Sequence, residues 1–369
     1  MNVLVVSGIW PPDVGGPASH APALADFLRE RGHGVEVVTT ASAEPAARAY
    51  PVRWVDRAAP KGLLHARVVR LIAARARAAD VVYATSMASR SALATALAGT
   101  PLVVKAAGDV AYERSRRLGL FHGDLDEFQR AGGPVVRAFK AARSAALGRA
   151  AAVVFPSGYL RGLALGWGLE AERLHVVPNP APPLPPLRDN VSRVPGAFAF
   201  AGRLTAAKSL EVAFRAIAAV DGATLDVAGD GEERARLEAA AGELGVGDRV
   251  RFLGSQTRER VLDLFRAAEA CVLSSTWENF PHVVVEALAV GTPVVATAVG
   301  GVAEVVEDGQ NGLLVAPGDA HELAGALRRI LDEPGLRERL AAAAAPSVAD
   351  YGAERIHGRL EELLRRAAR

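Results

Sequence analysis

Two glutamates, Glu278 and Glu286, have the spacing that most strongly indicates chemistry. Glu278 precedes an Asn-Phe-Pro-His turn, and Glu286 lies in an apolar run, 283–289, that predicts the first turns of a helix. A carboxylate in the loop and another one helical turn into the helix can reach two ends of one polyhydroxylated ligand. Burial of Glu286 is costly unless its oxygens are hydrogen-bonded, and a ribose diol would satisfy both. The alternative is that Glu286 caps a neighbouring loop.

A pair of cations, Arg203 and Lys208, follows a predicted strand and precedes the next predicted helix. Cations at a helix N-terminus interact unfavourably with the helix dipole. The presence of two cations there is better explained if an anion binds between them. Arginine can hold two phosphate oxygens, and lysine adds a point charge. Two solvated loop side chains are the alternative, and the neighbouring glutamates favour the anion site.

The first half of the chain offers further candidates in loops after predicted strands. Gly15 and Gly16 would let the backbone approach a ligand at a helix start, although a tight turn would also use them. His20 lies just inside that helix, with a packed or solvated histidine as the alternative. Asp109 lies at the edge where open α/β sheets bind ligands, but it would also serve as the N-cap of a helix over 110–117.

Composition indicates a globular chain with two cores. Of the 369 residues, 50% are hydrophobic and 23% are charged, which suits two domains better than one. Cys271 is the only cysteine and lies in an apolar run, which predicts a packed, inert thiol in a reducing compartment. The start lacks the basic flank of a signal peptide, and no apolar run reaches the ~20 residues that span a bilayer. We therefore expect a cytoplasmic protein.

Strand-like runs alternate with helical patterns in both halves, which predicts an α/β fold with parallel sheets. Seven prolines between Pro178 and Pro195 indicate an extended linker. We expect a first domain over 1–178, a linker over 179–195, a second domain over 196–345 and a terminal segment over 346–369. That segment would contain a helix over about 353–366 after a break at Pro346, and the helix can cross back onto the first domain. The predicted strands are 3–7, 35–39, 80–84, 101–105, 152–156, 197–201, 224–228, 249–253, 270–273, 294–297 and 312–315.

An ordered set of motifs resembles the retaining glycosyltransferases of family 4, with their Glu-x7-Glu signature, among the glycosyl transferases group 1. The resemblance spans the whole chain and implies the GT-B fold, in which two Rossmann-like domains face each other across a cleft. The motifs are Pro-Pro-Asp-Val-Gly-Gly (11–16), Gly-His-Gly-Val (32–35), 157–167, Val-Val-Pro-Asn (176–179), Gly-Arg with lysine (202, 203 and 208), Ala-Gly-Asp-Gly (228–231), Phe-Leu-Gly (252–254) and 278–312.

The resemblance implies roles for the candidate residues. Arg203 and Lys208 would hold the donor diphosphate as it leaves, and Glu286 would bind the ribose hydroxyls. Such a reaction needs stabilisation of the departing diphosphate and of an oxocarbenium-like centre. Contacts to the donor sugar and diphosphate would come from Glu278, from the turn after it and from the glycine pair: Asn279, Phe280, Pro281, His282, Gly15 and Gly16.

Two departures from the family pattern concern the acceptor side. Many relatives carry a histidine at the edge of the first sheet, where this chain has Ala-Ala-Gly-Asp (106–109), so Asp109 is a candidate catalytic substitute. His20 is a weaker candidate on the acceptor side. Many relatives also have glycine after the Pro-Asn pair, where this chain has Pro180. No Asp-x-Asp or histidine cluster suggests a metal, so the expected reaction needs no metal or cofactor, only a nucleotide diphosphate sugar, with UDP or GDP undecided.

The leading hypothesis is a retaining glycosyltransferase that moves a hexose to a lipid-linked, polysaccharide or small-molecule hydroxyl acceptor. An epimerase or hydrolase of the same fold and a non-catalytic nucleotide-sugar-binding protein are the alternatives. Residues 1–180 hold 22 basic and 14 acidic side chains, a balance of +8, and the remainder balances at −6. Basic helical stretches over 63–79 and 136–149 therefore suggest contact with an anionic membrane, with ordinary half-buried helices as the alternative. Aromatic residues make up only 5% and are not interleaved with basic ones, which argues against nucleic acid.

Overall fold

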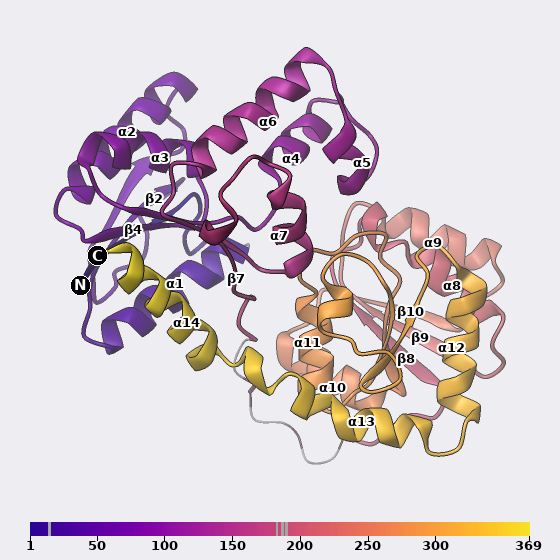
Figure 1. Cartoon of the computed structure of the whole chain (residues 1–369). Coiled ribbons are helices and arrows are strands. Elements are labelled where there is room, and N and C mark those ends of the chain that lie inside the picture. Colours follow the sequence, from indigo (N-terminus) through magenta and orange to yellow (C-terminus); the bar gives the residue numbers. More distant parts are fainter. Residues whose placement is uncertain (14–15, 182–183, 186–187, 189–190) are drawn as a thin grey trace. The chain divides into compact units, whose positions relative to one another are not determined.

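The computed structural model describes every residue except 14–15, 182–183, 186–187 and 189–190. The chain divides into two compact units (Figure 1). The first comprises Met1–Asn179 with Glu354–Arg369, and the second comprises Pro180–Ala353. The predicted linker is partly outside the described residues.

The first unit contains a seven-stranded parallel sheet in the order β3-β2-β1-β4-β5-β6-β7. Its central strands are buried on both faces, as the near-continuous apolar runs require. The strands are β1 (Asn2–Ser7), β2 (Gly34–Ala41), β3 (Val52–Asp56), β4 (Val81–Ala84), β5 (Leu102–Lys105), β6 (Ala152–Phe155) and β7 (Leu174–Val176). The helices are α1 (Gly16–Glu30), α2 (Lys61–Ala76), α3 (Ala88–Ala98), α4 (Val110–Arg117), α5 (Leu125–Arg130), α6 (Pro134–Leu147) and α7 (Gly158–Leu165), with α14 (Ala353–Ala367) from the C-terminus.

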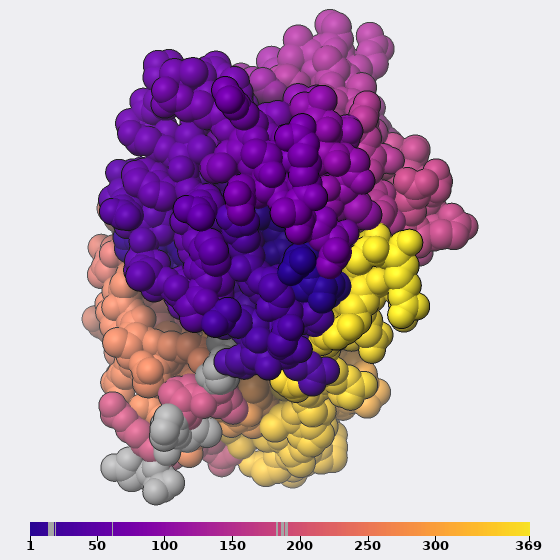
Figure 2. Space-filling view, turned by 90° about the vertical axis from the view of Figure 1, so that its left-hand side faces the viewer, coloured from indigo at the N-terminus to yellow at the C-terminus, as the bar shows by residue number. Residues whose placement is uncertain are grey.

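Helix α14 packs on the first unit although it follows the second in sequence. Ile356, Leu360 and Leu364, spaced by four residues, form one buried stripe in the core that α1 and β1 share. The yellow helix beside the indigo N-terminal segments in Figures 1 and 2 is α14. On its polar side Glu361 accepts hydrogen bonds from Arg365 at 2.7 Å and Arg31 at 3.3 Å, and its carboxylate is 2.9 Å from His33 Nε2.

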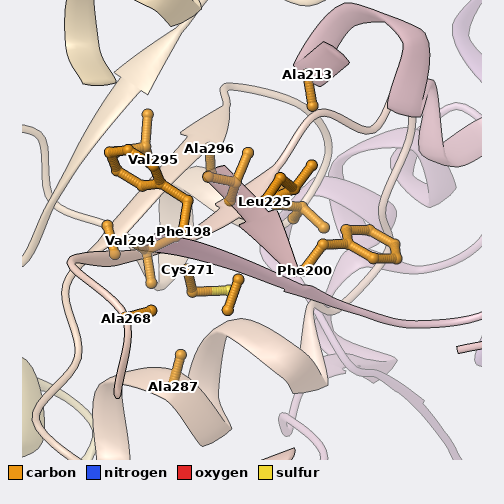
Figure 3. Close-up of a cluster of buried hydrophobic side chains, with 14 of the residues drawn as sticks. Phe198, Phe200, Ala213, Leu225, Ala268, Cys271, Ala287, Val294, Val295 and Ala296 are labelled. Atoms are coloured by element: carbon orange, nitrogen blue, oxygen red, sulfur yellow. The ribbon is translucent and has the colours of Figure 1, made fainter. Parts of the chain in front are cut away.

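The second unit contains a six-stranded parallel sheet in the order β10-β9-β8-β11-β12-β13. Its core is drawn in Figure 3, where Phe198, Phe200 and Leu225 pack with Cys271. The strands are β8 (Ala197–Ala201), β9 (Thr224–Ala228), β10 (Val250–Gly254), β11 (Ala270–Leu273), β12 (Val294–Thr297) and β13 (Gly312–Val315). The helices are α8 (Leu210–Ala218), α9 (Arg234–Glu243), α10 (Arg258–Ala267), α11 (His282–Ala289), α12 (Ala320–Asp332) and α13 (Leu336–Ser347).

The parallel α/β prediction is confirmed, and three details differ. Strands β3 and β7 were not predicted because both lie at an edge of the sheet and are only partly buried, so neither gives a continuous apolar run. The third difference is one of position: α13 includes Pro346 and ends at Ser347, so the predicted break before α14 lies one residue later than expected. A proline this close to the end of a helix removes a single helical hydrogen bond.

Candidate functional site

The strand order of the second unit reverses between β8 and β11. The chain runs from β8 to β9 and β10 on one side, then returns to β11, β12 and β13 on the other. Ligands of open α/β sheets bind beyond the carboxyl ends of the strands at such a point. The segments that follow these two strands are 202–209 and 274–281, and they contain Arg203, Lys208 and Glu278.

Hydrogen bonds tie these two loops and the end of β12 together. Ser274 Oγ donates to the carbonyl oxygen of Lys208 at 2.9 Å, and the Thr276 amide donates to the carbonyl of Ala207 at 2.9 Å. Thr297 Oγ1 donates to the carbonyl of Ser275 at 2.6 Å. These hydrogen bonds therefore fix the loops after β8 and β11 to each other and to the end of β12 at the predicted site.

The structure brings together Lys208 and Glu278, two of the predicted catalytic residues. Lys208 Nζ lies 2.5 Å from Glu278 Oε1, and Ser275 Oγ donates to the same oxygen at 2.7 Å. The two ion-pair side chains are only 20% and 13% exposed. Both charges are thus held in place beside the switch point, and a phosphate that enters would compete with Glu278 for the lysine ammonium.

Arg203 is exposed and has no hydrogen bond or ion pair with any described residue. It follows Gly202, whose φ is 155°, and the neighbouring loop after β9 begins with Gly229, whose φ is 148°. A Cβ on Gly229 would overlap the carbonyl oxygen of Gly202, so the glycine allows the two backbones to approach closely. This contact fixes the backbone from which Arg203 projects and leaves its guanidinium available to an anion.

Glu286 lies on α11, as predicted, and it has a partner that the sequence did not suggest. Arg258, at the start of α10, donates from Nε to Glu286 Oε1 at 2.9 Å. The Glu286 side chain is 17% exposed. Burial raises the pKa of the Cys271 thiol to about 12, and the charge of Glu286 adds to that rise while Lys208 opposes it. Both charges therefore act near the end of β11, and the predicted inert thiol is confirmed as a buried group.

The turn between Glu278 and α11 has two buried side chains at its centre, Phe280 and Pro281. Phe280 is 8% exposed and its ring packs against Tyr351 at 5.6 Å between centroids, and Pro281 is buried as well. Helix α11 begins at His282 without a side-chain cap, but the amides of His282 and Val284 donate to the carbonyl oxygens of Phe280 and Pro281 at 3.1 and 3.0 Å. Asn279 and His282 are half-buried and exposed, respectively.

Two glycines after β12 hold the backbone of Glu278. The Gly301 amide donates to the Glu278 carbonyl at 3.1 Å. Gly300 has a φ of 51°, and a Cβ there would overlap that same carbonyl oxygen. Only glycine fits such a position without strain. The Gly-Gly pair within 278–312 thus positions Glu278, which the sequence alone did not indicate.

In the first unit, Asp109 has a structural role. It is the N-cap of α4, and its Oδ1 accepts from the amides of Ala111 at 2.9 Å and Tyr112 at 3.3 Å. Its Oδ2 lies 2.5 Å from Arg143 Nη1, and the two side chains are 0% and 4% exposed. Arg143 in turn lies over the Trp167 ring at 3.8 Å. The capping alternative is confirmed, and we do not retain Asp109 as a catalytic candidate because both oxygens are buried and occupied.

The other first-unit candidates lie at the start of α1. Gly16 is the first residue of the helix, and Gly15 lies outside the described residues. His20 is half-buried, with its Nε2 at 3.0 Å from the hydroxyl of Tyr83 on β4. The His20 ring also lies 6.0 Å from the ring of His357 on α14. His20 is therefore directed toward the sheet.

Models of two protein-family domains match the chain. The model "Glycosyl transferase 4-like domain" matches residues 15–180, and "Glycosyl transferases group 1" matches residues 194–346. The chain belongs to the group 1 glycosyl transferases. The predicted family resemblance is thereby confirmed, and the second match contains the Arg203, Lys208, Glu278 and Glu286 set.

Curated relatives of this group 1 member share part of its length. An α-D-kanosaminyltransferase of Streptomyces kanamyceticus is 37% identical over 151 residues, which are 40% of this chain and 39% of that protein. A D-inositol 3-phosphate glycosyltransferase of Mycolicibacterium smegmatis is 41% identical over 150 residues, which are 39% of this chain and 35% of that protein. The chain thus spans about two fifths of the curated relatives it matches.

A solved structure matches the group 1 member over its full length. The Anabaena protein Alr3699/HepE in complex with UDP has a TM-score of 0.79 and 22% identity, with 99% of this chain and 100% of that chain covered. At this identity the likeness establishes a shared fold, the predicted pair of Rossmann-like domains.

The described residues of this group 1 member contain neither a metal-binding cluster nor a membrane-spanning helix. No three His, Cys, Asp or Glu side chains among the described residues are grouped so that they could hold a metal ion. None of the described helices is both long enough and apolar enough to span a bilayer.

Sequence reasoning missed one residue of the site, Arg258. Nothing in the sequence indicates its pairing with Glu286, because that pairing depends on how α10 and α11 pack.

Proposed function

We propose that this group 1 member is a retaining, metal-independent hexosyltransferase that uses a nucleotide diphosphate sugar and a hydroxyl acceptor. The observation that carries the proposal is the Lys208–Glu278 ion pair at the β8–β11 switch point, beside the exposed Arg203. Two cations and two carboxylates on two adjoining loops and helix α11 suit a ligand with a diphosphate at its centre and hydroxyls at both ends. Arg258 adds a third cation at the edge of this set.

The proposed reaction uses these charges to stabilise the leaving group. The bond between the anomeric carbon and the diphosphate oxygen breaks, and a bond to the acceptor oxygen forms on the same face of the sugar. The acceptor proton passes to the departing phosphate. Arg203 and Lys208 would stabilise the charge that develops on that phosphate. Glu278 would hold donor sugar hydroxyls once Lys208 turns to the phosphate, and Glu286 would hold the ribose.

The donor is proposed to be a UDP-sugar. Support comes from the structurally similar Anabaena protein, which is described in complex with UDP and with UDP-glucose. An epimerase or hydrolase of the same fold would use the same donor, so the products formed with and without an acceptor distinguish these activities. A non-catalytic binding protein could hold the diphosphate with the same cations, and slow turnover with every donor and acceptor would support that alternative.

We expect Glu286→Gln to weaken binding of UDP by about tenfold, the effect of roughly one charge-assisted hydrogen bond. Glu278→Gln should leave UDP binding within about twofold and weaken UDP-glucose binding, because its carboxylate would contact the sugar. Titration calorimetry with UDP and with UDP-glucose measures both effects. Glu238→Gln, an exposed carboxylate paired within α9, is the control. Equal losses for both site variants with both ligands would refute this division of roles.

We also propose that the first unit binds an anionic membrane surface through α2 and α3. Neither helix contains an acidic residue. Between them runs a groove of about 800 Å³, lined by Arg70, Arg77, Leu93 and Leu97 among others. Leu93 and Leu97 are 54% and 62% exposed. The purple surface that faces the viewer in Figure 2 includes this part of the first unit, and its mixture of arginine and leucine suits anionic headgroups above acyl chains.

The second predicted basic stretch does not contribute in the same way. On α6, Arg143 is buried against Asp109, and Lys140 donates to the carbonyl oxygens of Phe128, Gln129 and Ala131 at the end of α5. These two cations are therefore used within the unit, whereas Arg137 and Arg149 of the same stretch are exposed. We assign the membrane surface to α2 and α3 because their groove combines arginines with exposed leucines.

We expect the full chain to float with vesicles that contain phosphatidylglycerol and not with neutral vesicles. Arg70→Ala with Arg77→Ala should remove most of this recovery, since each basic residue near anionic lipid contributes about 1 kcal/mol. Raising the salt concentration should also release the protein. The matched control is Arg215→Ala with Arg339→Ala, two exposed arginines of the second unit. Equal recovery on neutral and anionic vesicles, or none on either, would exclude this surface and favour a soluble acceptor.

A further inference from the structure

Four polar side chains from four elements meet beneath the start of α1. Lys105 is the last residue of β5 and lies on the same face of the sheet as Val103, which packs in the core shared with α1 and α14. His357 of α14 lies close enough that the charge of Lys105 acts on it. His20 lies against both His357 and Tyr83. All four belong to the first unit.

Two nitrogen atoms of this cluster have no hydrogen-bond partner among the described residues. They are Lys105 Nζ and His357 Nε2, on side chains of residues that are only 5% and 3% exposed. Burial lowers the pKa of Lys105 to about 7 and, together with the lysine charge, lowers the pKa of His357 to about 4. A buried ammonium without a partner is costly, and an anion that paired with Lys105 Nζ would offset that cost.

The carboxylates nearest in the fold are occupied elsewhere. Asp109, four residues after Lys105, is held by Arg143 and by the first amides of α4. Glu361, one turn after His357, is held by His33, Arg31 and Arg365. No carboxylate contributes to the pKa shift of Lys105 or of His357. The missing anion is therefore not supplied by a described side chain.

The position of the cluster suits a ligand that arrives from solvent. Lys105 ends its strand, so it lies at the carboxyl edge of the sheet, where ligands of parallel α/β sheets bind. Helix α1 begins four residues before His20 and has no acidic residue in its first turn, and the N-terminus of a helix favours an anion. His20 is only half-buried, so this member of the cluster is in part reached by solvent.

We propose that Lys105, with His20 and His357 beside it, forms a subsite of the first unit that binds a phosphate group of the acceptor. The inference rests on the proposed transferase function only in naming the acceptor as the source of that phosphate. Tetrahedral phosphate can take several hydrogen bonds from one ammonium and from helix amides. Binding would pair the buried lysine charge, and it would orient an acceptor hydroxyl relative to the anionic group.

The test is phosphate binding observed at Lys105 itself. The chain contains only four lysines, Lys61, Lys105, Lys140 and Lys208, so the side-chain resonances of a lysine-labelled sample are few, and Lys105→Met identifies one of them. Inorganic phosphate, glucose 6-phosphate and a short-chain phosphatidic acid are titrated separately, without nucleotide. We expect at least one organic phosphate to shift the Lys105 resonance, and the preference between the last two distinguishes a soluble from a lipid acceptor.

Affinity in variants gives the second readout. The variants are made in a chain that also carries Arg203→Ala and Lys208→Met, so that the proposed phosphate contacts in the second unit are removed. In this chain Lys105→Met should weaken phosphate binding at least tenfold. The control Arg29→Met, which replaces an exposed cation of α1, should leave phosphate binding unchanged. A Lys105 resonance unmoved by all three ligands would overturn the proposal, as would equal affinity in the Lys105→Met chain. If Lys105→Met does not fold, the Lys105 resonance is assigned by elimination with Lys61→Met, Lys140→Met and Lys208→Met, and its shift in the unsubstituted protein decides. Phosphate binding without transfer would leave this site standing and the transferase proposal refuted.

Discussion

Lys208→Met should lower turnover with a nucleotide sugar by about 10²- to 10³-fold at saturating donor. The variant removes a charge that would stabilise the leaving diphosphate, and loss of one such contact typically costs about 3–4 kcal/mol of barrier. Methionine keeps the apolar stem, which is mostly buried with 20% of the lysine side chain exposed. Turnover measured at several donor concentrations separates this loss from weaker donor binding.

The same substitution leaves the Glu278 carboxylate without its ion-pair partner, so the stability of the variant has to be measured separately from its activity. Loss of the partner of a carboxylate that is 13% exposed should cost about 1–3 kcal/mol. Adding Glu278→Gln neutralises the stranded group and should restore part of that stability while turnover stays low. If Lys208→Met turned over normally, or if the double variant regained activity together with stability, the leaving-group role of Lys208 would be wrong.

Asp109→Ala should destabilise the first unit by about 3–5 kcal/mol, which is the cost of leaving a buried charge without its partner. The unpaired group would be Arg143, whose side chain is 4% exposed and fixed over Trp167. Loss of the α4 cap contributes about 1 kcal/mol of the effect. Urea denaturation followed by tryptophan fluorescence measures it, because Trp167 lies within the affected network.

A structural role for Asp109 also predicts which variants rescue it. Asparagine can still cap α4, so Asp109→Asn should cost less than Asp109→Ala. Combining Asp109→Asn with Arg143→Met, which removes the stranded charge, should recover further stability. Folded Asp109→Asn protein should retain turnover within about threefold, a loss below 1 kcal/mol. A drop of several hundredfold at unchanged stability would restore Asp109 as a catalytic candidate.

The sequence was sufficient for the parts of the fold that depend on local pattern. Buried parallel strands are continuous apolar runs, so β1, β5 and β11 were predictable, while the half-exposed edge strand β3 was not. Helix α14 was predicted within one residue at its C-terminal end because its apolar positions repeat at helical spacing. The break before α14 was predicted within one residue, because a proline in the last turn of α13 allows the helix to end just after it.

The site was predictable where residue type alone states the chemistry. Four charged residues that follow buried strands or lie within an apolar helix could be identified from the sequence: Arg203, Lys208, Glu278 and Glu286. Partners that depend on tertiary packing were not visible in the sequence. Arg258 meets Glu286 only because α10 and α11 pack together, and Lys105 lacks a partner only because α14 and α1 cover the end of β5.

The proposed function requires that a nucleoside diphosphate binds at the β8–β11 switch point through Arg203 and Lys208. Titration calorimetry of UDP, GDP and ADP against the unsubstituted chain and against Arg203→Ala with Lys208→Met tests this binding most directly. We expect at least one of these nucleotides to bind the unsubstituted chain, and the double variant to lose at least about 100-fold in affinity, or roughly 2.7 kcal/mol. Equal affinity for both proteins, or no binding of any nucleoside diphosphate, would contradict it.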